Sequence, residues 1–212
     1  MAGGVIDHPV RGRLNAWFFR ALDEYMHAKY ADIKAGLLRE APPVVVELGP
    51  GSGANLRYLA PGTRLIAVEP NVHMHPLLRQ RARQFGVDLD LHGLAGEALD
   101  LPSASADFVF SSLVLCSVEH PARVIAEVRR VLKPGGRFAC IEHVIAPEGS
   151  SILRLQRAIR GPWKWLFEGC DLCRDTGATL RASGFASVDV QPLVLPTMFV
   201  PIRHQIAALC VN

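Results

Sequence analysis

The sequence predicts an α/β fold in which a mostly parallel sheet is covered by helices on both faces. Short apolar runs of strand length alternate with segments of helical periodicity through the middle of the chain. These runs are apolar almost throughout, which is typical of parallel strands that are buried on both faces. Two further runs near the C-terminus bring the predicted sheet to seven strands.

The first forty residues precede the alternating pattern. Apolar side chains recur at helical spacing from Phe18 to Leu37, which predicts one or two amphipathic helices before the sheet. We expect residues 1–42 to form a lid or brace.

Residues 43–145 carry the alternation and are expected to form the core that binds a ligand. The predicted elements are strands at 44–49, 64–70, 87–92, 107–115 and 137–145, and helices from Asn55, from His73 to Phe85 and over 121–132. The last helix runs into Lys133-Pro134-Gly135-Gly136. Proline cannot continue a helix and glycine adopts the left-handed conformation that caps one, so we expect a glycine cap there.

Residues 146–212 are expected to close the domain and to contribute helices on the substrate side. The predicted elements are a helix through Leu153 and Trp165, a capped helix from Thr176 to Ser183 that ends at Gly184, and strands at 187–195 and 204–211. No linker or internal repeat interrupts the pattern, so we predict that residues 1–212 form one domain.

Composition and charge restrict the possible functions. Half of the residues are apolar and a fifth are charged, which excludes a disordered chain. The net charge is +3 and the basic residues are scattered, so no nucleic-acid partner is indicated. Because no apolar stretch reaches the length of a signal peptide or a membrane span, we expect no stable membrane anchor.

The cysteines are five in number, at positions 116, 140, 170, 173 and 210. An odd number at irregular spacing favours free thiols in a reducing cytoplasm. Cys170 and Cys173 form one C-x-x-C. A zinc site would require a second pair or nearby histidines, and a redox site would require a thioredoxin-like context. We therefore interpret the pair as incidental and expect no metal.

A glycine-rich loop follows the first predicted strand. Gly49, Gly51 and Gly53 stand in the segment VVELGPGSG, at the position where open α/β sheets bind ligands. Glycines let the backbone approach a ligand closely and adopt positive φ angles. On its own, the loop is equally compatible with a structural strand-to-helix turn.

Two acidic residues favour a ligand at this loop. Glu69 closes the second strand, twenty positions after Gly49, where its carboxylate could accept hydrogen bonds from both hydroxyls of a ribose. Glu47 stands just before the loop, where it would repel a pyrophosphate and attract a cationic ligand with an amino group. The spacing G-x-G-x-G also differs from the dinucleotide fingerprint G-x-G-x-x-G. The pattern therefore favours a ligand such as S-adenosylmethionine over NAD.

A third acidic residue, Glu97, follows the third predicted strand in the segment AGEA. An acidic side chain and a backbone amide at this position could bond the edge of an adenine. Taken alone, Glu97 is more typical of a solvated loop acid.

Four segments resemble the successive motifs of class I S-adenosylmethionine-dependent methyltransferases: VELGPGSGANL, AVEPN, GEALDLP and VLKPGG. The resemblance implies a Rossmann-like fold and S-adenosylmethionine as cofactor. It implies that the first loop holds the methionine part, the acid after the second strand the ribose, and the acid after the third strand lies beside the adenine. The residues carried over are Glu47, Gly49, Gly51, Gly53, Glu69, Pro70, Asn71, Gly96, Glu97, Ala98 and Leu113.

Three further segments are similar to the animal alkyl-thiol methyltransferases: SLVLCSVEHP, IEHV and FEGCDLCRDT. This similarity implies methylation of sulfur on a small thiol. The N-terminal residues do not show the hydrophobic anchor that ties the animal enzymes to membranes.

His143 is the candidate base and Asp171 its candidate partner. His143 lies at the carboxyl end of the fifth predicted strand, where an imidazole could accept the acceptor's proton. A histidine that is simply hydrogen-bonded at a strand end is the alternative. Asp171 could orient His143 or the substrate, or could pair with Arg174. Cys116 and Ser117 are expected near the methyl group, and the candidates for an apolar acceptor pocket are Trp17, Phe18, Trp163, Trp165, Phe167 and Phe199.

The sequence therefore predicts a cytoplasmic methyltransferase that acts on the sulfur of a small thiol. An O-, N- or C-methyltransferase of quinone or natural-product metabolism is the near alternative. An NAD-dependent oxidoreductase and a nucleoside-binding module without catalysis are the distant ones.

Overall fold

Seven strands form one sheet in the order β3-β2-β1-β4-β5-β7-β6. In the computed structural model, which describes residues 10–94, 96 and 98–212, the first five strands are parallel, and β7 runs antiparallel to both β5 and β6. The strands are β1 (Val44–Leu48), β2 (Arg64–Val68), β3 (Asp88–His92), β4 (Ala106–Ser112), β5 (Leu132–His143), β6 (Ser187–Val194) and β7 (His204–Val211). The predicted α/β fold with a mostly parallel seven-stranded sheet is confirmed.

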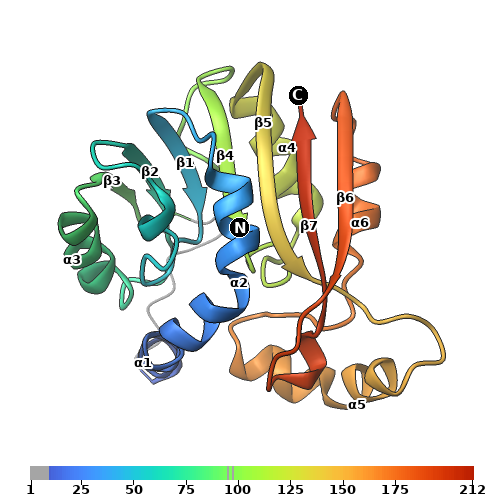
Figure 1. The fold of residues 1–212 in the computed structure, drawn as a ribbon. Coiled ribbons are helices and arrows are strands. Elements are labelled where there is room, and N and C mark those ends of the chain that lie inside the picture. Colours follow the sequence, from blue (N-terminus) through green and yellow to red (C-terminus); the bar gives the residue numbers. More distant parts are fainter. Residues whose placement is uncertain (1–9, 95, 97) are drawn as a thin grey trace.

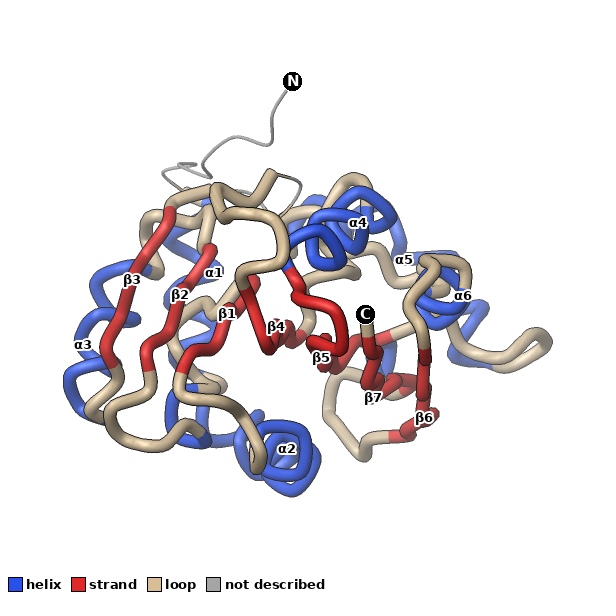
Figure 2. The backbone as a smooth tube through the Cα atoms, turned by 90° about the horizontal axis from the view of Figure 1, so that it is seen from above, coloured by secondary structure: helices blue, strands red, loops and turns tan. Residues whose placement is uncertain are grey.

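Helices cover both faces of this sheet and also the edge at which the parallel strands end. Helices α2 and α3 lie on one face, and α4 and α6 lie on the other (Figure 2). Helices α1 and α5 lie beyond the carboxyl ends of the parallel strands (Figure 1). The helices are α1 (Arg11–Ala21), α2 (Asp23–Leu38), α3 (His75–Phe85), α4 (Pro121–Val131), α5 (Ser151–Leu166) and α6 (Thr176–Arg181), with short 3₁₀ turns η1 (Leu56–Tyr58) and η2 (Val200–Ile202).

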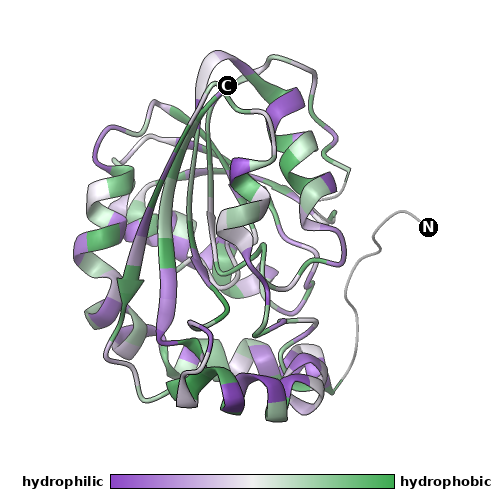
Figure 3. Ribbon diagram, turned by 90° about the vertical axis from the view of Figure 1, so that its right-hand side faces the viewer, coloured by the Kyte–Doolittle hydropathy of each residue, from purple (hydrophilic) through white to green (hydrophobic). Residues whose placement is uncertain are grey.

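The core is divided into two layers by the sheet. On one face, α4 buries an apolar stripe whose members are three or four residues apart, formed by Val124, Val128 and Val131. On the other face, Leu78 and Ala82 of α3 pack against the sheet. The helices that flank the sheet carry both hydrophobic and hydrophilic colours (Figure 3), as the periodic pattern of the sequence predicts. No helix in the described part of the chain is long and apolar enough to cross a membrane.

The helix predicted from Asn55 is wrong. The chain forms only the 3₁₀ turn η1 there, because Pro61 and Gly62 follow within a few residues and end any helix. The N–H of Gly62 bonds to the carbonyl of Gly86, and the chain then enters β2.

The glycine cap predicted after α4 is also wrong. Leu132, the residue after the helix, is extended, with φ −69° and ψ 136°, and β5 begins there directly. Gly135 does adopt a positive φ of 76°. Its N–H donates to the carbonyl of Asn212, the residue after β7. Gly135 therefore links β5 to the end of β7 and does not cap α4.

A buried carboxylate at the end of β5 holds the loop that follows β4. Glu142 is fully buried and accepts backbone hydrogen bonds from Val114, Leu115 and Cys116 at 2.8 to 3.1 Å. The turn begins at Leu113, whose φ is 60°. Three donors that face the interior are thereby satisfied by one side chain.

We expect Glu142→Ala to lower the free energy of unfolding by on the order of 3 kcal/mol or more, because three buried N–H groups lose their acceptor. Glu142→Gln keeps one acceptor oxygen and should lose less. Urea denaturation of both variants measures the effect. Glu148→Ala, which removes an exposed acid, is the control and should change stability by less than about 0.5 kcal/mol. Equal stability of Glu142→Ala and wild type would contradict this role.

Candidate active site

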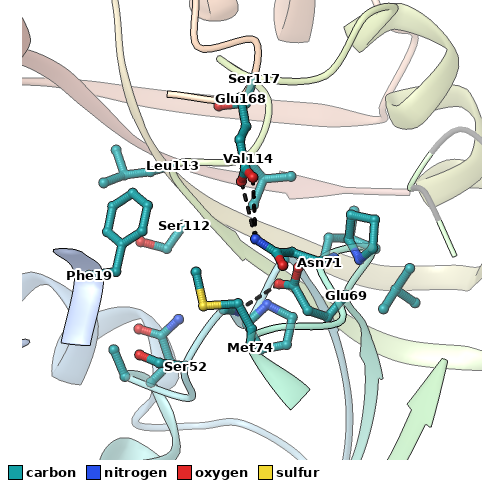
Figure 4. A pocket seen from close by; sticks show the side chains of 18 of the residues that line it. Phe19, Ser52, Glu69, Asn71, Met74, Ser112, Leu113, Val114, Ser117 and Glu168 are labelled. Atoms are coloured by element: carbon teal, nitrogen blue, oxygen red, sulfur yellow. Dashed lines mark hydrogen bonds between the residues drawn. The ribbon is translucent and has the colours of Figure 1, made fainter. Parts of the chain in front are cut away.

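A cleft of about 450 Å³ opens at the carboxyl ends of β1, β2 and β4. This is the switch point of the sheet, where the strand order reverses between β1 and β4. Its walls come from the glycine loop after β1, the loops after β2 and β4, helices α1 and α2, and the turn after α5. A ligand in this cleft would therefore touch segments that are far apart in the sequence, from Phe19 in α1 to Glu168 after α5 (Figure 4).

The three glycines of the loop all have positive φ angles but differ in what surrounds them. A Cβ at Gly49 would lie 2.5 Å from Val114 Cγ2, and one at Gly53 would lie 3.0 Å from Leu78 Cδ1. A Cβ at Gly51, with φ 55°, would meet no atom within 4 Å. Gly51 lines the cleft and Gly53 does not. Gly49 and Gly51 thus line the cleft, whereas Gly53 packs against Leu78 and Leu56. That these glycines hold a ligand stays a prediction.

Glu69 lies in the cleft with both carboxylate oxygens engaged by backbone. One accepts a hydrogen bond from Gly51 N and the other from Asn71 N, each at 2.8 Å. Burial raises the pKa of Glu69 to about 7, and the two backbone hydrogen bonds oppose that rise. Each oxygen keeps a lone pair that can accept a further hydrogen bond from a ligand.

Glu47 is fully buried behind the loop and is not among the described residues that line the cleft. Its Oε1 accepts a hydrogen bond from Asn55 Nδ2 at 2.6 Å, and Asn55 lines the cleft. Burial raises the pKa of Glu47 to about 7. Glu47 therefore faces a ligand only through Asn55.

Lys34 brings a cation from α2 into the same cleft. It is the only lysine or arginine among the described lining residues. Burial lowers its pKa to about 8, and the nearby Glu47 and Asp23 partly restore it. The cleft therefore offers both signs of charge close to the glycine loop.

The turn after α5 contributes Glu168, which the sequence did not single out. Glu168 has a φ of 49° and accepts hydrogen bonds from Asn71 Nδ2 at 3.3 and 3.4 Å. Figure 4 shows Asn71 with Glu69 on one side and Glu168 on the other. Gly169 makes this turn possible, because a Cβ there would lie 2.5 Å from the carbonyl oxygen of Ser117. In the sequence, the glycine that follows Glu168 in the segment FEGCD was the available sign of a tight turn at this position.

The remaining predicted cofactor residues divide into two groups. Pro70, Asn71, Gly96 and Leu113 line the cleft. Ala98 is exposed and is not among the described lining residues, whereas the next residue, Leu99, is buried in the core. Glu97 lies outside the described residues, so its role beside an adenine stays a prediction.

A second, smaller cavity of about 80 Å³ adjoins the cleft. Both are lined by Phe19, Met26, Leu113, Ser117 and Phe167. The other residues that line the small cavity are mostly apolar: Phe18, Leu22, Cys116, His143, Trp163, Cys170, Phe199 and Ile202. A small acceptor placed here would lie next to a ligand in the cleft.

Four of the six aromatic residues predicted for an acceptor pocket line this cavity. Trp17 and Trp165 do not, and they are 65% and 69% exposed. Both project from outer faces of α1 and α5, because a residue one or two positions from a buried one points to another side of a helix. Only some of the six candidates therefore line the cavity.

His143 lies at the carboxyl end of β5, as the sequence predicted, and is buried against the small cavity. Its Nε2 lies 2.9 Å from Cys170 Sγ. Trp163 Nε1 donates to the same sulfur at 3.2 Å. The hypothesis that His143 acts as a base stays a prediction.

The two cysteines of the C-x-x-C lie in different surroundings, as expected if their pairing is incidental. Cys170 is buried in contact with His143, whereas Cys173 is partly exposed and lies outside this contact. Hydrogen bonds from Cys116, His143 and Trp163 hold the pKa of Cys170 below its ordinary value. Two of the residues that contact Cys170, Cys116 and His143, are therefore distant in sequence.

The expectation that Asp171 orients His143 does not match the geometry. Its two carboxylate oxygens bond to Nε and NH2 of Arg160 at 2.8 and 2.7 Å. Arg174, the other expected partner, donates instead to the carbonyls of Leu115 and Val118. Arg160, on α5, pairs with Asp171 through two parallel hydrogen bonds, a bidentate geometry that is stronger than a single contact. Asp171 thus braces the loop.

Comparison with known proteins shows similarity to methyltransferases. A methyltransferase domain model matches residues 46–140. The chain is 34% identical to thiol S-methyltransferase TMT1B of Rattus norvegicus, over 79% of this chain and 70% of that protein, and 32% identical to thiol S-methyltransferase TMT1B of Homo sapiens, over 91% and 80%. A solved S-adenosylmethionine-dependent methyltransferase of Thermotoga maritima shares the fold, with a TM-score of 0.65 and 20% identity over 94% of this chain and 97% of that one.

Gly51→Val should abolish detectable binding of S-adenosylmethionine, because the new side chain would fill open space in the cleft. Gly62→Val is the matched control. Gly62 also has a positive φ, 86°, and open space around its Cβ, but it lies outside the cleft. Both variants should carry a similar backbone strain, on the order of 1–2 kcal/mol, which urea denaturation measures. Equal calorimetric affinities of the two variants would show that the cleft is not the cofactor site.

The affinity for S-adenosylmethionine should rise as the pH is raised through about 7. Burial raises the pKa of Glu69 to about 7, so Glu69 is protonated below this pH and loses acceptor capacity for ribose hydroxyls. Glu69→Gln should weaken binding by on the order of 10- to 100-fold at about pH 8. Its profile should also be flatter, with the remaining slope due to Glu47, whose pKa burial raises to about 7, and, in the opposite direction toward pH 8, to Lys34, whose pKa burial lowers to about 8. Calorimetry from about pH 6 to about pH 8 tests this, and a parallel profile in Glu69→Gln would refute the assignment.

Proposed function

The chain belongs to the thiol S-methyltransferase family of S-adenosylmethionine-dependent methyltransferases, and we propose on that premise that it methylates the sulfur of a small, apolar thiol. The observation that carries the choice of acceptor is the small apolar cavity beside the cofactor cleft, whose polar groups include two cysteines and one histidine. The proposal also includes a reducing cytoplasm as the place of action, which five free cysteines support.

The residues of the cleft fit S-adenosylmethionine. The volume of the cleft, about 450 Å³, lies in the range of small-molecule sites. Glu69 offers free lone pairs to the ribose hydroxyls, Gly51 leaves room for the methionine part, and Lys34 offers a cation to the methionine carboxylate. When bound, the cofactor supplies a methyl group on a sulfonium, which is already an excellent leaving group.

The second cavity fits an acceptor with a short apolar body. Its volume of about 80 Å³ admits only a small group, and aromatic side chains enclose it. Trp163 and Phe167 are in contact, with ring centroids 4.4 Å apart, and Phe18 packs against both Phe167 and Phe199. These rings exclude water and favour an alkyl or aryl group over a charged one.

The protein's task is alignment more than activation. Methyl transfer is an in-line displacement, so holding acceptor and methyl group in contact removes most of the entropic barrier. Leu113, Ser117 and Phe167 line both cavities and stand between the two reactants. A thiol suits such a site, because its thiolate is intrinsically nucleophilic and forms near neutral pH.

Matched acceptors test the atom type. We expect methyl transfer to an alkanethiol to be at least about 100-fold faster than to the alcohol of the same chain length, because few alcohol molecules are ionised at neutral pH. Thiophenol and phenol form a second pair, and a short alkylamine covers nitrogen. Labelled S-adenosylmethionine gives kcat/KM for each compound.

Two variants control this experiment. Gly51→Val should transfer to no acceptor, and Gly62→Val should retain the wild-type ranking. Preferred transfer to the phenol or the amine would favour an O- or N-methyltransferase and reject the proposal. Cofactor binding without transfer to any acceptor would favour the nucleoside-binding module.

A further inference from the structure

Three side chains that the cofactor site does not use meet at one wall of the acceptor cavity. The sulfurs of Cys116 and Cys170 and a ring nitrogen of His143 all lie within 4.8 Å of one another. All three residues are buried, with exposed fractions of 1%, 8% and 2%. They come from the loop after β4, the turn after α5 and the end of β5, so the fold alone brings them together.

We propose that Cys116, His143 and Cys170 bind one Zn²⁺, whose fourth coordination position is open to the acceptor cavity. Two thiolates and one imidazole form a donor set that Zn²⁺ prefers, and three protein ligands with one open position are typical of its catalytic sites. The inference rests on the proposed function for the occupant of that position, which is the sulfur of the acceptor.

The spacing of the donors is compatible with the ion. Tetrahedral Zn²⁺ separates two sulfurs by about 3.8 Å and a sulfur and a nitrogen by about 3.6 Å, from the usual bond lengths. The three donor atoms already lie within 4.8 Å of one another. The contact of 2.9 Å between His143 Nε2 and Cys170 Sγ would lengthen by about 0.7 Å as the ion enters between them.

The surroundings hold the donors in place. Trp163 Nε1 donates a hydrogen bond to Cys170 Sγ, as outer partners of metal-bound thiolates do. The N–H of Asp171 bonds to the carbonyl of Cys116 at 2.8 Å, which links the two cysteine segments directly. Glu142 fixes the N–H of Cys116 from the other side. The ligands are therefore positioned before the ion arrives.

The charge balance of such a site suits a buried position. Two thiolates and a neutral imidazole neutralise Zn²⁺, so the loaded site carries no net charge and avoids much of the cost of burying ions. An acceptor thiolate in the fourth position would make it −1, opposite the positive sulfonium of the cofactor. The attraction would draw the two sulfurs together.

The reaction balances with this ion in place. The acceptor's S–H bond breaks when its sulfur binds Zn²⁺, and the proton leaves to solvent. A lone pair of that sulfur forms the new S–CH₃ bond, while the sulfonium S–CH₃ bond breaks and its electron pair stays on S-adenosylhomocysteine. The thioether product is neutral and a weaker ligand, so it departs. In this account His143 is a ligand and not the proton acceptor.

Metal binding is measured on the full chain, reduced and freed of metal by chelation. After equilibrium dialysis against Zn²⁺, elemental analysis should give one ion per chain. Cys116→Ser and Cys170→Ser should each weaken Zn²⁺ binding by at least about 100-fold. The matched control is Cys173→Ser, which changes the neighbouring cysteine of the same C-x-x-C and should keep full affinity. Thermal melts confirm that all three variants fold.

Co²⁺ in place of Zn²⁺ shows by its absorption spectrum whether a thiol binds at the fourth coordination position. Adding an alkanethiol without cofactor should change the thiolate-to-cobalt absorption, and the matching alcohol should not. Metal-free wild type, full occupancy in Cys116→Ser and Cys170→Ser, or a spectrum that the thiol leaves unchanged would each overturn the inference.

The metal measurements are independent of turnover. Thiol methylation by wild type that binds no metal would overturn the site and leave the proposed function standing. One ion per chain in a protein that methylates no thiol would support the metal site and reject the proposed acceptor.

Discussion

Buried backbone N–H groups at the carboxyl end of the sheet impose the constraint on which both cavities depend. The loops after β1, β2 and β4 are not in regular structure, yet they are covered by α1, α2 and the turn after α5, so their donors must find acceptors within the protein. Carboxylates at the ends of two strands supply them. Glu69 bonds to Gly51 and Asn71, and Glu142 bonds to three successive residues of the loop after β4. These acids shape the cofactor cleft and the acceptor cavity before any ligand binds.

The same burial sets the electrostatics of the cleft. Burial raises the pKa of Glu47 and of Glu69 to about 7 and lowers the pKa of Lys34 to about 8. All three charged forms are therefore costly in the free protein. S-adenosylmethionine, which carries an amino group, a carboxylate and a positive sulfonium, would lower that cost. Its amino group, carboxylate and hydroxyls would supply the partners that water would otherwise provide. We therefore expect this arrangement to favour S-adenosylmethionine over a pyrophosphate-containing nucleotide.

The smaller cavity is assembled from helices α1 and α2, the loop after β4 and segments of the C-terminal third of the chain. Glu168 and Gly169, with φ angles of 49° and 100°, allow the turn after α5 to approach the loop after β4. That approach places Cys170 against His143 and closes the cofactor cleft with Glu168. This turn thus contributes to the walls of both cavities, and a side chain on Gly169 would clash with the carbonyl of Ser117 in the loop after β4.

The sequence alone determined the sheet, the glycine loop and Glu69, because these depend on periodicity and on spacing along the chain. It failed at the helix from Asn55 and at the glycine cap after α4, where short connections to the next strand outweighed local propensity. It also offered His143, the substrate and Arg174 as partners of Asp171, whose carboxylate in fact bonds to Arg160, and it gave Cys170 no contacts beyond the C-x-x-C pair. Only the tertiary structure decided those points and brought Lys34, Glu168 and the Cys116–His143–Cys170 cluster to the cavities. Their partners lie tens of residues away, and such contacts are set by how helices and loops pack on the sheet, which no local pattern of residues encodes.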